Sequence, residues 1–218
     1  MIAYGYIIWG FIFFPLWLLF FLSRKDLRKP MITLGLIFAP QGAIYEFNWL
    51  LKDYWNPLVS MTKISFVLQE MAFIFIMVGV LFLYLLLFVK KLGNKIDWNN
   101  IIIPILTSLI TFEVIKIIGI KSIYALYLSQ TSTAFYIWLK QPTLIKVSLF
   151  NFAYGCLLAF IGFSIFQRLF PDILGMWWNL EKLSGIFIFT VPLEEILWLG
   201  FIGIGFGILP QFVYEEED

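Results

Sequence analysis

The chain is a succession of long apolar stretches separated by short polar segments. Each stretch is about as long as a helix needs to cross the hydrocarbon core of a bilayer, roughly 17–25 residues. The pattern predicts seven transmembrane helices, over residues 2–22, 31–50, 64–89, 101–119, 123–139, 143–167 and 186–213. The connecting segments are too short to fold as a separate domain, so we expect an all-α, polytopic membrane protein.

Three short sequence patterns occur twice along the chain, in the same order. The paired segments are 28–32 with 140–144, 54–56 with 177–179, and 64–70 with 189–195. Helices one to three therefore match helices five to seven, and the fourth helix gives both triplets the same orientation, as in a parallel repeat. We expect a first three-helix repeat at 1–89, a linking helix at 90–120, and a second repeat with an acidic tail at 121–218.

Basic residues are concentrated in the connections after helices one, three and five. These connections are the predicted loops 23–30 and 90–98 and the tight turn at 140–142. Because cytoplasmic connections carry an excess of Lys and Arg, the amino terminus is expected outside and the solvated acidic tail, 215–218, in the cytoplasm.

Composition narrows the chemistry that the chain can perform. Hydrophobic residues make up 61% of the sequence and charged residues 13%, which excludes an ordinary soluble domain. There is no histidine, and Cys156 is the only cysteine, so a Ser-His-Asp triad, an intrachain disulfide and a Cys-based metal site are excluded. Acid–base chemistry must fall to Asp, Glu, Lys, Arg or Tyr. We expect no metal and no cofactor, and the net charge of +1 gives no sign of a nucleic-acid partner.

Two adjacent carboxylates, Glu194 and Glu195, lie inside the last apolar stretch. A charged side chain at bilayer depth costs about 2.5–3.5 kcal/mol on insertion scales, so such a residue usually has a function. Pro192 precedes the two acids and, inside a helix, would displace the carbonyl of Ile188 and cause a kink. The alternative is that a helix ends here and both acids lie among the lipid headgroups.

Further acids are expected at the same depth. Glu46 lies late in the second helix and Glu70 early in the third, so both fall in the outer half of the bilayer with Glu194 and Glu195. Because Glu70 and Glu195 are equivalent in the repeat, we expect them to share a pocket, an arrangement suited to acid–base catalysis. Gln69 stands where the second copy has Glu194.

Tryptophans at this depth offer aromatic faces to a cation. Such a face stabilises a cation by about 0.5–2 kcal/mol, and Trp55 and Trp198 are our candidates for this role. The alternative is an aromatic belt at the membrane interface, which we favour for Trp177 and Trp178.

The sequence Pro192-Leu193-Glu194-Glu195, within a parallel three-helix repeat, resembles the membrane-embedded lycopene cyclases. These carotenoid cyclases occur as heterodimers in some bacteria and as fused domains in fungi, and the wider arrangement is similar to seven-helix bacterial members. Three further segments carry the resemblance: 24–28, 53–55 and 122–125. It implies a protein of the bacterial inner membrane.

The resemblance also implies an activity, the redox-neutral closure of the end groups of lycopene into β-ionone rings. The implied catalytic residues are Glu194 and Glu195, to which the repeat adds Glu70. We expect the substrate to be bound by Pro192, Trp55, Trp198, Gln69 and Glu46. In the first repeat Val67 replaces the proline and Gln69 the first glutamate, so an enzyme that needs the motif in both halves would be impaired.

Other functions stay open at the level of the sequence. A non-catalytic protein that binds isoprenoids or lipids, or that acts in assembly, would keep the same fold. A small proton-coupled transporter would also use intramembrane acids. The residues therefore do not decide whether the chain is an enzyme of the intramolecular lyase or isomerase type. The expected partners are a hydrophobic isoprenoid or carotenoid and the lipid bilayer, and a homo-oligomer is left open.

Overall fold

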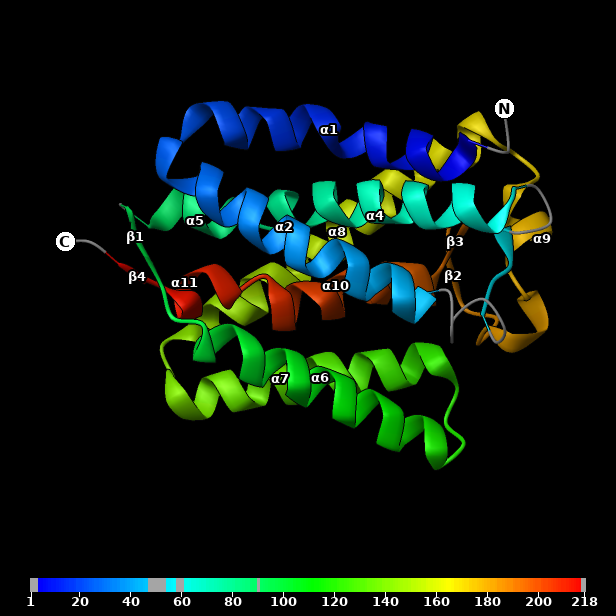
Figure 1. The fold of residues 1–218 in the computed structure, drawn as a ribbon. Helices are drawn as coiled ribbons and strands as arrows, with labels where there is room; N and C mark the ends of the chain where they lie inside the picture. The colour runs from blue at the N-terminus through cyan, green and yellow to red at the C-terminus, as the bar shows by residue number, and fades with distance from the viewer. Residues whose placement is uncertain (1–3, 47–53, 58–60, 90, 217–218) are drawn as a thin grey trace.

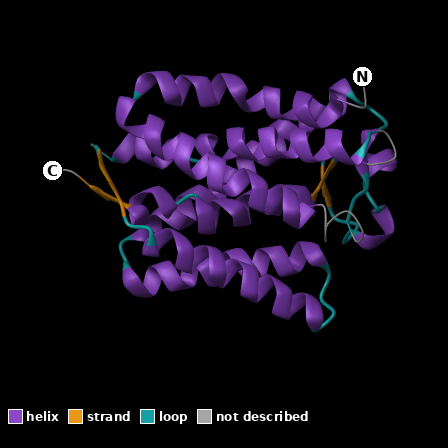
Figure 2. Ribbon diagram, in the orientation of Figure 1, coloured by secondary structure: helices purple, strands orange, loops and turns teal. Residues whose placement is uncertain are grey.

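The computed structural model describes residues 4–46, 54–57, 61–89 and 91–216. The long helices are α1 (Gly5–Ser23), α2 (Lys25–Tyr45), α4 (Lys63–Val80), α6 (Asn99–Ile117), α7 (Ser122–Lys140), α8 (Leu144–Leu169) and α10 (Leu193–Phe206). The shorter ones are α5 (Leu83–Phe88), α9 (Ile173–Trp177), α11 (Leu209–Val213) and the 3₁₀ turn η4 (Leu180–Lys182). The strands are β1 (Leu92–Ile96), β2 (Phe187–Ile188), β3 (Val191–Pro192) and β4 (Tyr214–Glu216). Helix dominates the chain, as Figure 2 shows, and the all-α prediction is confirmed.

The long helices lie lengthwise against one another in one bundle (Figure 1). Helix α4 packs on α1 and α2, whereas α10 packs on α7 and α8, and α6 packs on α7. The strands β1 and β4 lie at one end of the bundle, and β2, β3 and α9 lie at the other. Helices α4 and α10 both begin at the end where β2, β3 and α9 lie.

Four helical segments of the described chain are long and apolar enough to cross a membrane. They are Lys63–Phe88, Asn99–Ile117, Leu144–Leu169 and Leu193–Val213. A shorter apolar helix runs over Ile7–Ser23. A multi-pass membrane protein is compatible with this result, while the seven spans and the internal repeat stay predictions.

The predicted boundary between the first two helices was wrong. The segment 23–30 is not a loop, because α2 begins at Lys25 and only Arg24 has extended backbone between the two helices. The bounds predicted for the third helix, 64–89, agree with the segment Lys63–Phe88, within which a turn after Val80 separates α4 from α5. The predicted end of the second helix at residue 50 lies outside the described residues.

The acidic tail and the loop 90–98 pair with each other instead of being solvated separately. Strand β4 is antiparallel to β1, with Leu92 opposite Glu216 and Ile96 opposite Tyr214. A main-chain ladder satisfies the backbone polar groups of both segments, which the charge pattern alone does not reveal. Positions 217 and 218 of the predicted tail lie outside the described residues.

Pro192 does not kink a helix, so that prediction was wrong. Strands β2 and β3 form a short antiparallel hairpin, and Phe189 in its turn has a φ of 55°. Pro192 is the N-cap residue of α10, and the Leu193 amide donates to the Ile186 carbonyl at 2.9 Å. Proline favours helix starts because its fixed φ suits the first turn and it needs no amide partner there. Glu194 and Glu195 are thus in the first turn of α10, where the helix dipole favours negative charge.

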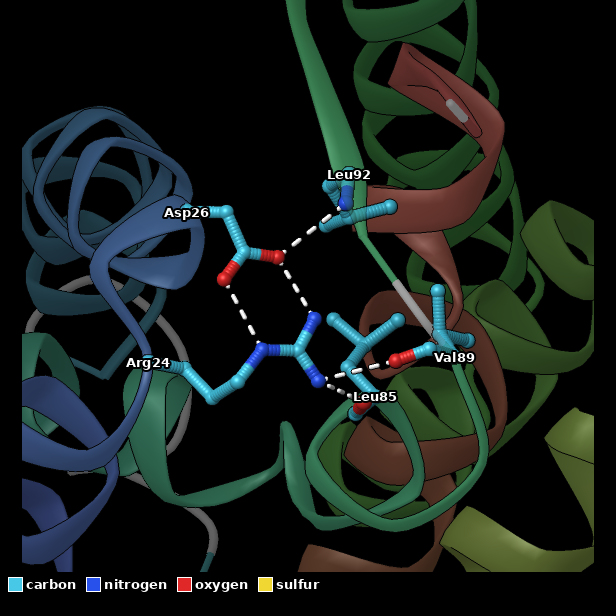
Figure 3. Close-up of polar contacts among 5 residues, drawn as sticks. All are labelled: Arg24, Asp26, Leu85, Val89 and Leu92. Atoms are coloured by element: carbon cyan, nitrogen blue, oxygen red, sulfur yellow. Dashed lines mark hydrogen bonds and ion pairs between the residues drawn. The ribbon is translucent and has the colours of Figure 1, made fainter. Parts of the chain in front are cut away.

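At the opposite end of the bundle, Arg24 joins three segments (Figure 3). Its Nε and Nη2 donate to the two carboxylate oxygens of Asp26, at 2.8 and 2.5 Å, and its Nη1 donates to the carbonyls of Leu85 and Val89. The Leu92 amide donates to the same carboxylate at 3.1 Å. This contact fixes the start of α2 against the end of α5 and the start of β1.

Candidate functional site

Two aromatic loops meet at the end of the bundle where α4 and α10 begin. The Asn56 amide donates to the Trp177 carbonyl at 2.5 Å, and the Asn179 amide donates to the Tyr54 carbonyl at 3.0 Å. Trp55 and Trp178 are the central antiparallel pair between these two bonds. The two hydrogen bonds are reciprocal, the pattern that a local two-fold axis produces between the segments 54–56 and 177–179.

These loops hold the carboxylate of Glu195. The Tyr54 hydroxyl and the Trp178 indole Nε1 both donate to Oε1 of Glu195, each at 2.6 Å. Glu195 is 4% exposed, so both bonds lie in a space from which bulk water is excluded. One loop from each half of the chain therefore orients the same carboxylate oxygen.

Tyr54 acts as a permanent donor in this arrangement. Burial raises the pKa of the Tyr54 hydroxyl well above its ordinary value, and the negative charge of Glu195 raises it further. The hydroxyl therefore keeps its proton over the whole physiological pH range and donates to Glu195 throughout.

Glu46 and Glu70 are the other buried acids of this end. Glu46 follows the last residue of α2 and is 5% exposed, and its Oε2 accepts a hydrogen bond of 2.8 Å from Trp55 Nε1. Glu70 on α4 is fully buried. Glu70 and Glu195 both lie close enough for their charges to act on Glu46. Glu46, just after α2, therefore interacts with an acid of α4 and with an acid of α10.

Two adjacent cavities contain these acids. The smaller one is lined by Trp9, Glu46, Tyr54, Trp55, Trp178, Glu195 and Trp198. The larger one has an internal volume of about 60 Å³ and lies between α2, α4, α7 and α10, with Glu46, Glu70 and Trp198 in its wall. Most of its remaining lining is aliphatic and aromatic, as in pockets that hold apolar small molecules. Glu46 and Trp198 belong to both cavities.

Stacked rings form the walls around the acids. The Trp198 ring stacks on Phe73 with centroids 5.9 Å apart, and Trp9 stacks on Phe73 and on Phe166 at 5.0 and 5.2 Å. Because aromatic faces carry partial negative charge, such walls favour a cation that forms beside them.

Three of the predicted site residues lie apart from this group. Glu194, Gln69 and Pro192 are absent from the described lining of both cavities. Oε1 of Glu194 accepts a hydrogen bond from the Ser184 amide, and Oε1 of Gln69 accepts one from the Ile7 amide. The two adjacent cavities are lined by the other five predicted residues, which are Glu46, Glu70, Glu195, Trp55 and Trp198. Glu70 lines the larger cavity and Glu195 the smaller one, so the expectation that these two share one pocket was wrong.

Sequence reasoning missed two groups that hold Glu195. Trp177 and Trp178 are 1% and 5% exposed, so the prediction that they form an interfacial belt was wrong. The sequence analysis gives Tyr54 no role beyond its place in the repeated segment 54–56. The signal that could have found both is the repeat, which makes the segments around Tyr54 and Trp178 equivalent and therefore candidates to pair.

The all-α fold and its four long apolar helices are compatible with a multi-pass membrane protein. Its buried carboxyls lie beside tryptophans in an acidic, aromatic cavity. Residues 121–214, which include α7, α8 and α10, match the family model described as lycopene cyclase. The resemblance is thereby confirmed over residues 121–214. No curated protein and no solved structure matches the chain.

Proposed function

We propose that the protein closes an end group of a linear carotenoid into a ring by acid–base chemistry, without redox change. The family match supports a cyclase-like role in carotenoid biosynthesis and implies a hydrophobic carotenoid substrate. The observation that carries the proposal is the group of three buried carboxyls, Glu46, Glu70 and Glu195, beside a largely apolar cavity. The binding-protein and transporter alternatives are not favoured by the match.

The chemistry needs one proton donor and one proton acceptor. A carboxylic acid adds its proton to the terminal double bond, and the resulting carbocation is attacked by a neighbouring double bond, which forms the ring. A carboxylate then removes a proton from the ring carbon and restores a double bond, so the product is an isomer of the substrate. Glu70 and Glu195 exchange these protons with the substrate, and Glu194 positions the start of α10.

The walls of the cavity suit the cationic intermediate. Trp198 lies in the wall of both cavities, and its face stabilises a carbocation by about 0.5–2 kcal/mol. Exclusion of water by the rings protects the cation from capture as an alcohol. Trp55 contributes by holding Glu46.

Expression in a lycopene-accumulating bacterium tests this proposal, with the pigments separated by chromatography. We expect γ-carotene or β-carotene from the natural chain and lycopene alone from Glu195→Gln. The matched control is Glu113→Gln, because Glu113 is a helix glutamate outside both cavities, and this variant should keep the activity. The proposal would be refuted if the host still contained only lycopene although immunoblotting detected the natural chain in its membrane.

We also propose that the acidic end faces the outside, with the amino terminus outside and the carboxyl terminus in the cytoplasm of a bacterium. The excess of basic residues at the Arg24 end supports this orientation. A fluorescent protein fused after Asp218 should fluoresce, whereas alkaline phosphatase fused there should be inactive. The opposite pair of results would reverse the orientation.

A further inference from the structure

After the proposed cyclisation, the two reacting carboxyls have exchanged their protonation states. The donor has lost a proton to one carbon of the substrate, and the acceptor has gained one from another carbon. The reaction is an isomerisation, so no oxidant or reductant takes part and the proton count of the protein is unchanged. A second turnover requires that a proton pass from the acceptor back to the donor.

Glu46 lies where such a transfer would occur. It is in the wall of the smaller cavity together with Glu195 and in the wall of the larger one together with Glu70. The other residue that lines both cavities is Trp198, whose indole ring carries no exchangeable acid of suitable strength. Glu46 is therefore the carboxyl shared by the two cavities.

The contacts of Glu46 leave it suited to carry a proton. Trp55 donates to Oε2 and fixes the orientation of the carboxyl without supplying a charge. No Lys or Arg appears in the described lining of either cavity. Mutual repulsion disfavours the simultaneous ionisation of three neighbouring buried carboxyls, and this favours a proton that moves among them.

Resting on the proposed cyclase function, we propose that Glu46 returns the proton from one reacting carboxyl to the other after each ring closure. The groups that face Glu46 are Glu70 from α4, Glu195 from α10 and the indole of Trp55. In this cycle the proton removed from one substrate molecule is delivered to the next. Bulk water takes no part in the reset of the site.

Deuterium labelling tests this cycle directly. Membranes containing the protein are supplied with lycopene in D₂O, and the cyclic product is analysed by mass spectrometry. The natural chain should give rings with much less than one deuterium each, because the protons are recycled. Glu46→Gln has no carboxyl for the transfer, so its reset depends on solvent: its turnover should fall at least about tenfold while deuterium rises toward one per ring.

Further variants separate this role from a purely structural one. Glu46→Asp keeps a carboxyl and should retain low deuterium content, whereas a structural defect would lower the rate without changing the label. One deuterium per ring from the natural chain, or an unchanged label in Glu46→Gln, would overturn the relay while leaving the cyclase function standing. Loss of the first turnover in Glu46→Gln would also overturn it, because the relay acts only between turnovers. Absence of any cyclic product from the natural chain would instead refute the proposed function itself, and the relay with it.

Discussion

Gln69 and Glu194 make the same contact in the two halves of the chain, since each accepts a hydrogen bond from the main-chain amide of another segment. Oε1 of Gln69 accepts from the Ile7 amide of α1 at 3.0 Å, and Oε1 of Glu194 accepts from the Ser184 amide at 2.5 Å. A carbonyl oxygen of an amide performs this task as well as a carboxylate oxygen does. The replacement of glutamate by glutamine at position 69 therefore does not remove a group that the proposed chemistry needs.

This relationship predicts that Glu194→Gln keeps most of the cyclase activity. The glutamine oxygen can still accept from the Ser184 amide, and we expect less than about a tenfold loss, or about 1.4 kcal/mol. Glu195→Gln should abolish the activity under the same conditions. Pigment ratios in the lycopene-accumulating host, normalised to protein in the membrane, provide the measurement. Equal losses in the two variants would show that Glu194 reacts with the substrate.

The sequence was informative about the acids because charged residues stand out in apolar stretches. Depth along each helix then predicts that Glu46, Glu70 and Glu195 lie at one end of the bundle, where the structure has them. Helix direction and rise suffice for such an estimate, since each helix crosses the bundle in one pass.

The partners of these acids could not be predicted in the same way. The pairing of Trp55 with Trp178 is a main-chain contact between loops 123 positions apart, for which helical periodicity gives no signal. Pro192 was misread because an apolar run beside a proline is compatible with a kinked helix as well as with a hairpin that precedes a helix. The distinction depends on the turn at Phe189, whose positive φ is unusual for a large side chain.

The hydrogen bond from Tyr54 to Glu195 predicts a pH-independent defect in Tyr54→Phe. Loss of this donor from a buried carboxylate costs about 1.5–3 kcal/mol, or a loss in rate of roughly 10- to 150-fold if the bond is needed in the transition state. Because the pKa of Tyr54 is raised well above its ordinary value, the hydroxyl donates at pH 7 and still at pH 10. The ratio of the rates of natural chain and variant should be the same at both pH values. A ratio that falls between pH 7 and pH 10 would mean that Tyr54 loses its proton in that range.

The contact between Arg24 and Asp26 predicts a loss of stability at acid pH. Burial raises the pKa of Asp26, but hydrogen bonds from Arg24 and from the Leu92 amide outweigh this effect and leave that pKa below its usual range. The stabilisation is therefore complete above the ordinary aspartate pKa of about 4 and is lost as the pH falls through the lower folded-state value. Asp26→Asn should lower the free energy of unfolding by about 1–3 kcal/mol at pH 7.

Thermal unfolding in detergent at several pH values provides the check for Asp26→Asn. The difference in midpoint between natural chain and variant should be constant from pH 8 to about pH 5 and should shrink below about pH 4. Lys146→Gln serves as the control for a change of one charge, because Lys146 lies exposed on α8. A difference that stays constant down to pH 2 would rule out ionisation of Asp26 as the source of the stabilisation.

Close packing of α8 against α10 predicts that Gly203→Ala disrupts the second half of the bundle. A methyl group at Gly203 would collide with the main-chain carbonyl of Asn151, which has no flexible end to move aside. The same region is held by a 2.9 Å hydrogen bond from Asn151 Nδ2 to the Gly207 carbonyl, which separation of the helices would lengthen. We expect a loss of about 1–3 kcal/mol in stability, measured by thermal unfolding in detergent.

Gly175→Ala is the control, because a methyl group there meets nothing within 4 Å, and it should leave the midpoint unchanged. Equal midpoints for the two variants would show that α8 and α10 are free to separate without cost.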